Sequence, residues 1–123
     1  MDSEEALWNA VNEAIPYTTI LIADGTYNLA SHGYYVWIDT PNLTLRSASG
    51  DRDAVILDDN YQGSEIISIA ASNVTIADLT VKRAGTNPIH VVSTDGGDTL
   101  NTHIYNVHIV DPGQQAIVTS VRS

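Results

Sequence analysis

The length, composition and charge of the chain exclude several classes of protein. Its 123 residues are enough for one domain. Fifteen Asp and Glu against five Lys and Arg give a formal net charge of −10, which opposes nucleic acid and anionic membranes as partners. The absence of cysteine excludes disulfides and thiolate metal ligands. No signal-peptide pattern and no apolar run of about 18 residues occurs, so no membrane span is predicted.

An amphipathic helix is predicted at the N-terminus. Its apolar stripe follows the helical period and consists of Leu7, Ala10, Val11, Ala14 and Ile15. Asp2 with Glu5 three residues later fits a capping box, and Pro16 is expected to end the helix. We therefore expect a capping helix in residues 1–16 and the rest of a single domain in residues 17–123.

The remainder of the chain is typical of short strands separated by Gly, Asn, Asp, Ser and Pro. The strands that this pattern predicts are 19–23, 34–38, 43–45, 54–57, 65–69, 74–76, 79–81, 89–92, 103–104, 107–110 and 116–120. A bend is predicted at Ala77 and Asp78, between two of these strands. The chain is therefore expected to be nearly all β after its first helix.

The strands belong to an internal repeat. Asn42, Asn73 and Asn101 recur before similar strands, at two nearly equal intervals. Six further matches share the interval that separates Asn73 from Asn101: Ile76 with Ile104, Asp78 with Asn106, Leu79 with Val107, Val81 with Ile109, Gly85 with Gly113, and Ile89 with Ile117. A period near 30 that holds several short strands and no helix indicates an all-β solenoid.

The repeated asparagines predict a ladder. A side-chain amide both donates and accepts, so Asn42, Asn73 and Asn101 can bond to one another between successive coils, at an interior corner. The alternating aliphatic residues beside them are expected to stack into the core. Asn42-Leu-Thr and Asn73-Val-Thr also match the glycosylation sequon, but an interior ladder would make both matches false.

The order of these segments resembles the N-terminal portion of right-handed parallel β-helix proteins, the pectate-lyase-like superfamily. The resemblance runs from about Ala6 to Thr119 and rests on the N-terminal helix followed by "TTILIADGTY", "NLTLRSASGDRDAVILD" and "NVTIADLTVKRAG". It implies a right-handed three-sheet parallel β-helix with an N-terminal capping α-helix. It also implies an extracellular or periplasmic location, and a family of lyases, hydrolases and epimerases that act on polysaccharides, frequently acidic ones.

The same resemblance suggests where catalytic chemistry would lie. Such enzymes use Asp or Glu clusters that hold Ca²⁺ and an Arg or Lys that acts as base, usually on the middle coils. Lys82 and Arg83 are the candidate catalytic residues, although both are also expected to balance local acids. Asp95 and Asp98 are the candidate Ca²⁺ ligands. The acidic stretches 50–53, 57–60 and 95–98 lack the spacing of a known calcium loop and are more typical of turns, in which Asp satisfies its own backbone.

Other side chains are candidates for binding a substrate. Tyr34, Tyr35 and Trp37 would stack on sugar rings if exposed, although packing under the helix is the commoner outcome. His103 and His108 alternate with inward-facing aliphatic residues and should point outward, as should His90 between Ile89 and Val91. Outward histidines can bind a metal or move protons, but most are simply solvated.

Two function classes remain open from the sequence. One is a polysaccharide-active β-helix of the lyase or hydrolase type, represented by its N-terminal segment and not catalytic alone. The other is a non-catalytic carbohydrate-binding or structural β-solenoid, and an ice-binding solenoid is less supported because His103 interrupts the row of Thr44 and Thr75. No cap is recognisable after residues 117–121, so we also expect a C-terminally truncated piece that self-associates through its uncapped end.

Overall fold

The described part of the chain contains one N-terminal helix followed by ten strands. The computed structural model describes residues 4–29, 36–62, 65–93, 101–111 and 117–121. The helix is α1 (Glu4–Glu13). The strands are β1 (Thr19–Ile22), β2 (Gly25–Asn28), β3 (Val36–Ile38), β4 (Thr44–Ser47), β5 (Val55–Asp58), β6 (Ile67–Ile69), β7 (Thr75–Lys82), β8 (Ile89–Ser93), β9 (His103–Val110) and β10 (Ile117–Val121). The prediction of a mostly β chain with one N-terminal helix is confirmed.

Helix α1 forms where the sequence predicts it, but it is shorter than predicted. Leu7 and Val11 are buried, as the apolar stripe requires. The helix ends at Glu13, because the residues before Pro16 are biased away from helical geometry. Ile15 therefore falls outside the helix and is exposed, so its assignment to the apolar stripe was wrong. Asp2, half of the predicted capping box, lies outside the described residues.

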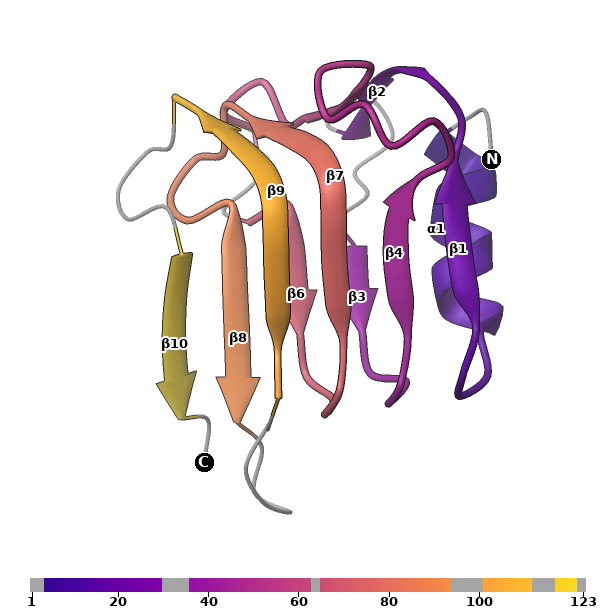
Figure 1. Ribbon diagram of the computed structural model, residues 1–123. Helices are drawn as coiled ribbons and strands as arrows, with labels where there is room; N and C mark the ends of the chain where they lie inside the picture. The colour runs from indigo at the N-terminus through magenta and orange to yellow at the C-terminus, as the bar shows by residue number, and fades with distance from the viewer. Residues whose placement is uncertain (1–3, 30–35, 63–64, 94–100, 112–116, 122–123) are drawn as a thin grey trace.

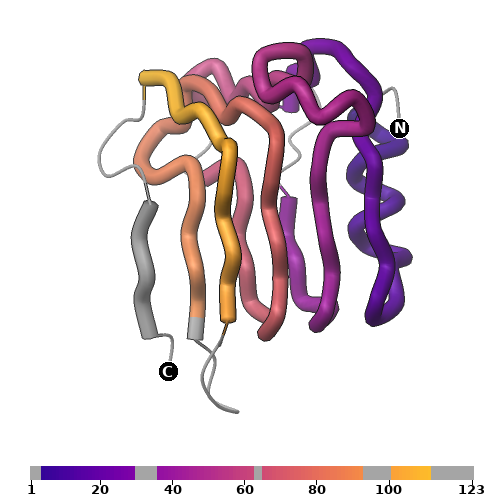
Figure 2. Tube along the Cα trace, in the orientation of Figure 1, coloured from indigo at the N-terminus to yellow at the C-terminus, as the bar shows by residue number. Residues whose placement is uncertain are grey.

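The strands form two sheets, and every strand pair in the described ranges is parallel (Figure 1). The larger sheet has the order β1-β4-β7-β5-β2, with β9 also paired to β7, and the smaller sheet has the order β10-β8-β6-β3. Neighbouring strands come from successive repeats, so Thr44 lies beside Thr75, and Thr75 lies beside His103. The Cα trace in Figure 2 shows the strands side by side, and the labels of Figure 1 place α1 at the opposite end of the row from β10.

The pairing register matches the repeat that the sequence predicts. Ile76 pairs with Ile104 and Leu79 with Val107, as the matched positions of the repeat require. Ile89 pairs with Ile117 at the same interval in the smaller sheet. The interval of the repeat therefore predicts which residues of these strands lie side by side.

Two single-residue corners explain why the structure has two sheets and not the three that were expected. Asp78 has φ +60° and Asn106 has φ +51°, a left-handed conformation that Asp and Asn tolerate. Strand β7 pairs with β4 before Asp78 and with β5 after it, so it runs unbroken through the corner. The predicted pairs of strands around Asp78 and Asn106 are therefore single strands, β7 and β9.

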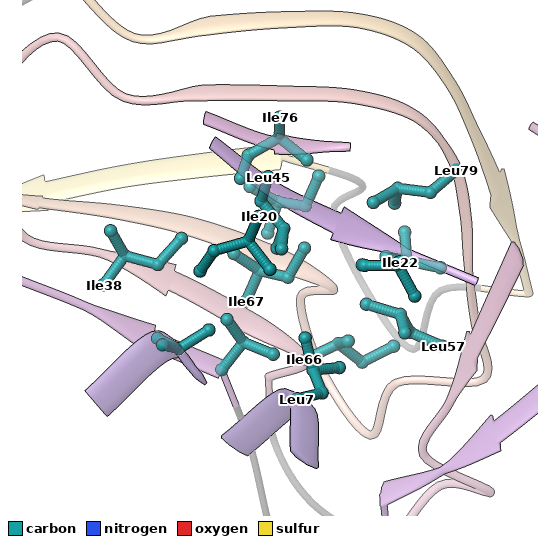
Figure 3. Close-up of a cluster of buried hydrophobic side chains, with 14 of the residues drawn as sticks. Leu7, Ile20, Ile22, Ile38, Leu45, Leu57, Ile66, Ile67, Ile76 and Leu79 are labelled. Atoms are coloured by element: carbon teal, nitrogen blue, oxygen red, sulfur yellow. The ribbon is translucent and has the colours of Figure 1, made fainter. Parts of the chain in front are cut away.

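The hydrophobic core lies between the two sheets, and α1 closes one end of it. Leu7 from α1 meets inward side chains from the strands and from the residue before β6 in Figure 3: Ile20, Ile22, Ile38, Leu45, Leu57, Ile66, Ile67, Ile76 and Leu79. Burying one such aliphatic side chain contributes about 1.5–3 kcal/mol. The equivalent residues of β9, Ile104, Val107 and Ile109, are only partly buried.

Strand β2 was not predicted from the sequence. It contains Gly25 and Asn28, which are depleted in strands, and only Tyr27 is buried. Its pairing with β5 over four residues holds it in the sheet. The backbone N–H of Asn28 also donates to the Glu4 carboxylate (Oε2) at 2.9 Å, which ties β2 to the first turn of α1.

Candidate functional site

The three repeated asparagines share one backbone conformation. Asn42, Asn73 and Asn101 have φ +60°, +62° and +59°, and each lies just before a strand of the larger sheet. Asn is among the few residues that adopt this left-handed conformation without large cost. The side-chain amide of Asn101 (Nδ2) donates to the Asn73 carbonyl (Oδ1) at 3.1 Å. Tyr17, with φ +68°, stands at the equivalent position before β1.

The asparagine row lies at the surface, which corrects the prediction of an interior corner. Asn73 and Asn101 are exposed and Asn42 is half-buried. The left-handed turn directs the next side chain inward, so Leu43 and Val74 are the buried residues at this point. Burial therefore gives no reason to dismiss the sequon at Asn73.

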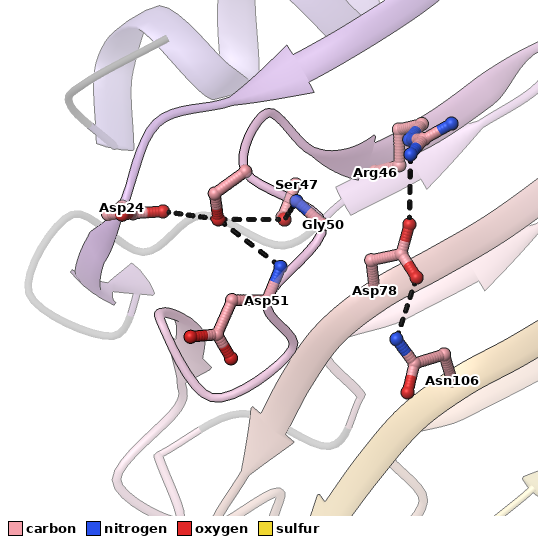
Figure 4. A network of polar contacts seen from close by, with 8 residues as sticks. Asp24, Arg46, Ser47, Gly50, Asp51, Asp78 and Asn106 are labelled. Atoms are coloured by element: carbon pink, nitrogen blue, oxygen red, sulfur yellow. Dashed lines mark hydrogen bonds and ion pairs between the residues drawn. The ribbon is translucent and has the colours of Figure 1, made fainter.

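A second polar row, which the sequence analysis did not recognise, occupies the corner of the larger sheet (Figure 4). Asp78 accepts a hydrogen bond from the Asn106 amide at 2.7 Å, and its other carboxylate oxygen lies 3.2 Å from Arg46 Nη2. Asp78 is only 8% exposed, so its charge needs these partners. The available signal was the recurrence of Asp and Asn at one point of the repeat.

Arg83, a candidate base, is held by Asp58 on the neighbouring strand. Its Nε donates to Asp58 Oδ1 at 3.0 Å, and its Nη2 contacts Oδ2 closely. Burial raises the pKa of Asp58, but the hydrogen bonds from Arg83 and from the Asn60 N–H outweigh it and leave the pKa below 3.8. The same pairing raises the pKa of Arg83 and favours its protonated form. Lys82, beside it, is half-buried at the end of β7.

The acidic stretches that the structure describes behave as turns. Asp51 accepts a hydrogen bond from the backbone N–H of Asp53 at 3.0 Å, and Asp58 accepts one from Asn60 at 2.9 Å. Both are the local bonds that favour Asp in turns, so the turn interpretation is confirmed at these two residues. Within the described ranges, no three His, Asp or Glu side chains form a group suited to a metal ion. Asp95 and Asp98 lie outside those ranges.

The three candidate histidines differ in their surroundings. His103 and His108 are exposed on β9, and His108 Nδ1 lies 3.8 Å from an oxygen of Asp53. The side chain of His90 is only 14% exposed, and its Nδ1 lies in close contact with Oε2 of Glu65. His90 is therefore largely covered, because Glu65 just before β6 reaches across to it.

The predicted aromatic site is only partly described. Tyr34 and Tyr35 lie outside the described residues, and Trp37 is half-buried on β3, on the face opposite Val36 and Ile38. An exposed aromatic residue of the larger sheet is instead Tyr105 on β9, whose side chain the sequence analysis did not single out. Its signal was the alternation with the inward-facing Ile104.

Tyr105 belongs to a row of outward side chains that crosses four strands. Leu21, Arg46, Ala77 and Tyr105 pair in register on β1, β4, β7 and β9. We call these four residues the Tyr105 row. Leu21 is 49% exposed, the Arg46 side chain 41% and Tyr105 52%, whereas Ala77 is covered. The face thus combines apolar surface with a hydrogen-bond donor.

A second row runs beside the Tyr105 row on the same face. It consists of Thr19, Thr44, Thr75 and His103, each two residues before a member of the first row. Thr19 and His103 are exposed, and Thr44 and Thr75 are half-buried. The outer face of β1, β4, β7 and β9, which faces the viewer in Figure 1, is therefore the candidate functional site.

Comparisons with known proteins identify no relative. No protein-family model, curated protein or solved structure matches the chain significantly. Among the described residues, no helix has the length and apolar character needed to cross a lipid bilayer.

Proposed function

We propose that the chain is the N-terminal segment of a right-handed parallel β-helix protein of the pectate-lyase-like kind. Three observations support this proposal. The strand pairs of the described ranges are parallel, and neighbouring strands come from successive repeats. Single left-handed residues at Asp78 and Asn106 turn the strands through a corner. Helix α1 contributes Leu7 and Val11 to the core at the end where the first strands lie.

We further propose that this segment contacts polysaccharide and is not catalytic on its own. The observation that carries the proposal is the outer face of β1, β4, β7 and β9, which is partly exposed and lined by apolar and hydrogen-bonding side chains in register. Proteins of the resembled superfamily act on polysaccharides outside the cytoplasm. By that resemblance we propose that this chain is also extracellular or periplasmic. A non-catalytic carbohydrate-binding or structural module would use the same face.

Arg83 does not fit the role of a lyase base. A general base must reach the proton that it removes and must be able to lose its own proton. Arg83 is engaged by Asp58, and this favours its charged form. Both carboxylate oxygens of Asp58 are already engaged, by the backbone N–H of Asn60 and by Arg83, so Asp58 does not fit a Ca²⁺ site.

The test is an assay for both cleavage and binding. The chain is incubated with polygalacturonate and with alginate, with and without Ca²⁺, and unsaturated products are followed by ultraviolet absorbance. It is also sedimented with insoluble polysaccharides. We expect retention in the pellet and no absorbance increase. A Ca²⁺-dependent increase that Lys82→Ala or Arg83→Ala abolishes would show that the segment is catalytic.

We also propose that the chain self-associates through the edge formed by β9 and β10. Ile104, Val107 and Ile109 on β9 are partly exposed, and a parallel edge at the end of a row of strands favours association with another strand. The charge of −10 opposes this, but its reach at 0.15 M salt is only about 8 Å. Light scattering over a concentration series should show a rising mass. A constant monomeric mass with and without added salt would contradict the proposal.

A further inference from the structure

We propose that the Tyr105 row is a binding site for an uncharged polysaccharide, with a sugar ring stacked on Tyr105. This inference rests on the proposed function and specifies its site and the class of glycan. The row of Leu21, Arg46, Ala77 and Tyr105 crosses the four strands at right angles to their direction.

The spacing of the row suits an extended polymer. Neighbouring strands lie about 4.8 Å apart, so the Cα atoms of Arg46 and Tyr105, two strands apart, are about 10 Å apart. The small side chain of Ala77 lies between them in register. A chain of sugars that lies across the strands therefore meets Leu21, Arg46 and Tyr105 in turn, and the apolar face of a sugar ring can cover an exposed aromatic ring.

The charged side chain of the row, Arg46, is held in place before any ligand arrives. Arg46 contacts Asp78 through Nη2, and Asp78 in turn accepts a hydrogen bond from Asn106, the residue after Tyr105. These contacts restrict Arg46, so less conformational entropy is lost when it donates to a sugar hydroxyl. Thr75 and His103, in the neighbouring row, add hydroxyl and imidazole groups on the same face.

The charges of the site favour an uncharged glycan over an acidic one. Asp78 lies 3.2 Å from Arg46 and offsets its positive charge, so the pair presents donors without net charge. The chain as a whole carries −10, so an acidic polysaccharide is repelled over the Debye length. A neutral glycan gains the hydrogen bonds and the stacking without this repulsion.

The experiment is affinity electrophoresis in native gels that contain soluble polysaccharide. Hydroxyethylcellulose and galactomannan serve as neutral probes, and polygalacturonate and alginate as acidic ones. We expect the neutral gels to retard the chain and the acidic gels to leave its mobility unchanged. Tyr105→Ala should weaken the retardation at least tenfold in apparent affinity, and Tyr105→Phe should retain it, because stacking needs the ring and not the hydroxyl.

Tyr61→Ala is the matched control, because Tyr61 is also 52% exposed but lies in the turn after β5, away from the row. Its retardation should equal that of the unmodified chain. Far-ultraviolet circular dichroism verifies that each variant is folded. Retardation that Tyr105→Ala leaves unchanged would overturn the Tyr105 row alone, and preference for the acidic gels would overturn the uncharged glycan. No retardation in any gel, together with no sedimentation with insoluble polysaccharide, would overturn the proposed function itself.

Discussion

Strands β7 and β9 have the same length and the same alternation, yet they make very different contributions to the core. Both have eight residues and turn a corner at a left-handed residue, and they pair with each other in register. The inward residues Ile76, Leu79 and Val81 of β7 are completely buried. Their counterparts on β9 are only partly buried. Similar patterns thus contribute different energies according to how completely the surrounding residues cover the inward side chains.

The largest expected effect is the difference in stability loss between substitutions at Ile76 and at Ile104. These two residues are of the same type and pair in register. Ile76→Ala should lower the free energy of unfolding by about 2–5 kcal/mol, because it leaves a cavity in a closed core. Ile104→Ala should cost about 1 kcal/mol, because its side chain is already partly solvated. Urea unfolding of both variants measures the difference. Equal losses would mean that β9 is as enclosed as β7.

The next effect compares the two ends of the hydrogen bond at the corner. Asp78→Ala should lower the free energy of unfolding by about 2–3 kcal/mol, because it removes the acceptor of Asn106, leaves Arg46 without its carboxylate and puts Ala in a left-handed conformation. Asn106→Ala removes one donor to Asp78 and also puts Ala in a left-handed conformation, but at an exposed position, so it should cost about 1–2 kcal/mol. Thermal unfolding of both variants provides the measurement, and a larger loss at Asn106 would contradict the assigned burial.

The third effect depends on pH and concerns the C-terminal end of β7, where Arg83 pairs with Asp58 on β5. Because the pKa of Asp58 is lowered in the folded chain, its stabilising contribution is complete above the ordinary value of 3.8 and is lost as the pH falls through the lowered value. Asp58→Asn should therefore cost about 1–2 kcal/mol near neutral pH and progressively less below pH 3.8. Urea unfolding across this range tests the sign. A difference that grows on acidification would contradict it.

The smallest effect concerns the surface asparagines before β7 and β9. Asn73→Ala should cost about 1 kcal/mol, mainly because Ala is strained at φ +62°. Asn73→Gly should cost less, because glycine adopts this conformation freely. Asn12→Ala, on the exposed face of α1, is the control and should change little. If Asn73→Gly is as damaging as Asn73→Ala, the side-chain bond to Asn101 is worth more than the backbone conformation.

Periodicity predicted the features that depend on neighbours along the chain. The stripe through Leu7 and Val11 predicted α1, and the constant interval of the repeat predicted the pairing of Ile76 with Ile104. Both signals work because hydrophobic spacing and turn residues act locally and recur. The bend at Asp78 was also readable, because Asp tolerates the left-handed conformation that a one-residue corner needs.

Features that depend on which strands are adjacent were harder to predict. The prediction that Asn73 and Asn101 occupy equivalent positions is confirmed. Whether the side chain of Asn73 is buried depends on the direction of the turn, which the sequence does not specify. The contact between His90 and Glu65 joins residues from two strand regions 25 positions apart. The Tyr105 row becomes visible only when β1, β4, β7 and β9 are placed side by side.

The near-constant repeat has a consequence for the rate of folding. Paired strands are separated by about 22–31 residues, so the entropy of closing each loop differs by only about 0.3 kcal/mol between pairs. No pair among the described strands gains an advantage from a short loop, and the pairing that buries most apolar surface should form first. Strand β7, whose inward residues are completely buried, belongs to such a pairing. We therefore expect Ile76→Ala to slow refolding, whereas Ile104→Ala should mainly accelerate unfolding. We expect the fold to grow outward from its middle strand.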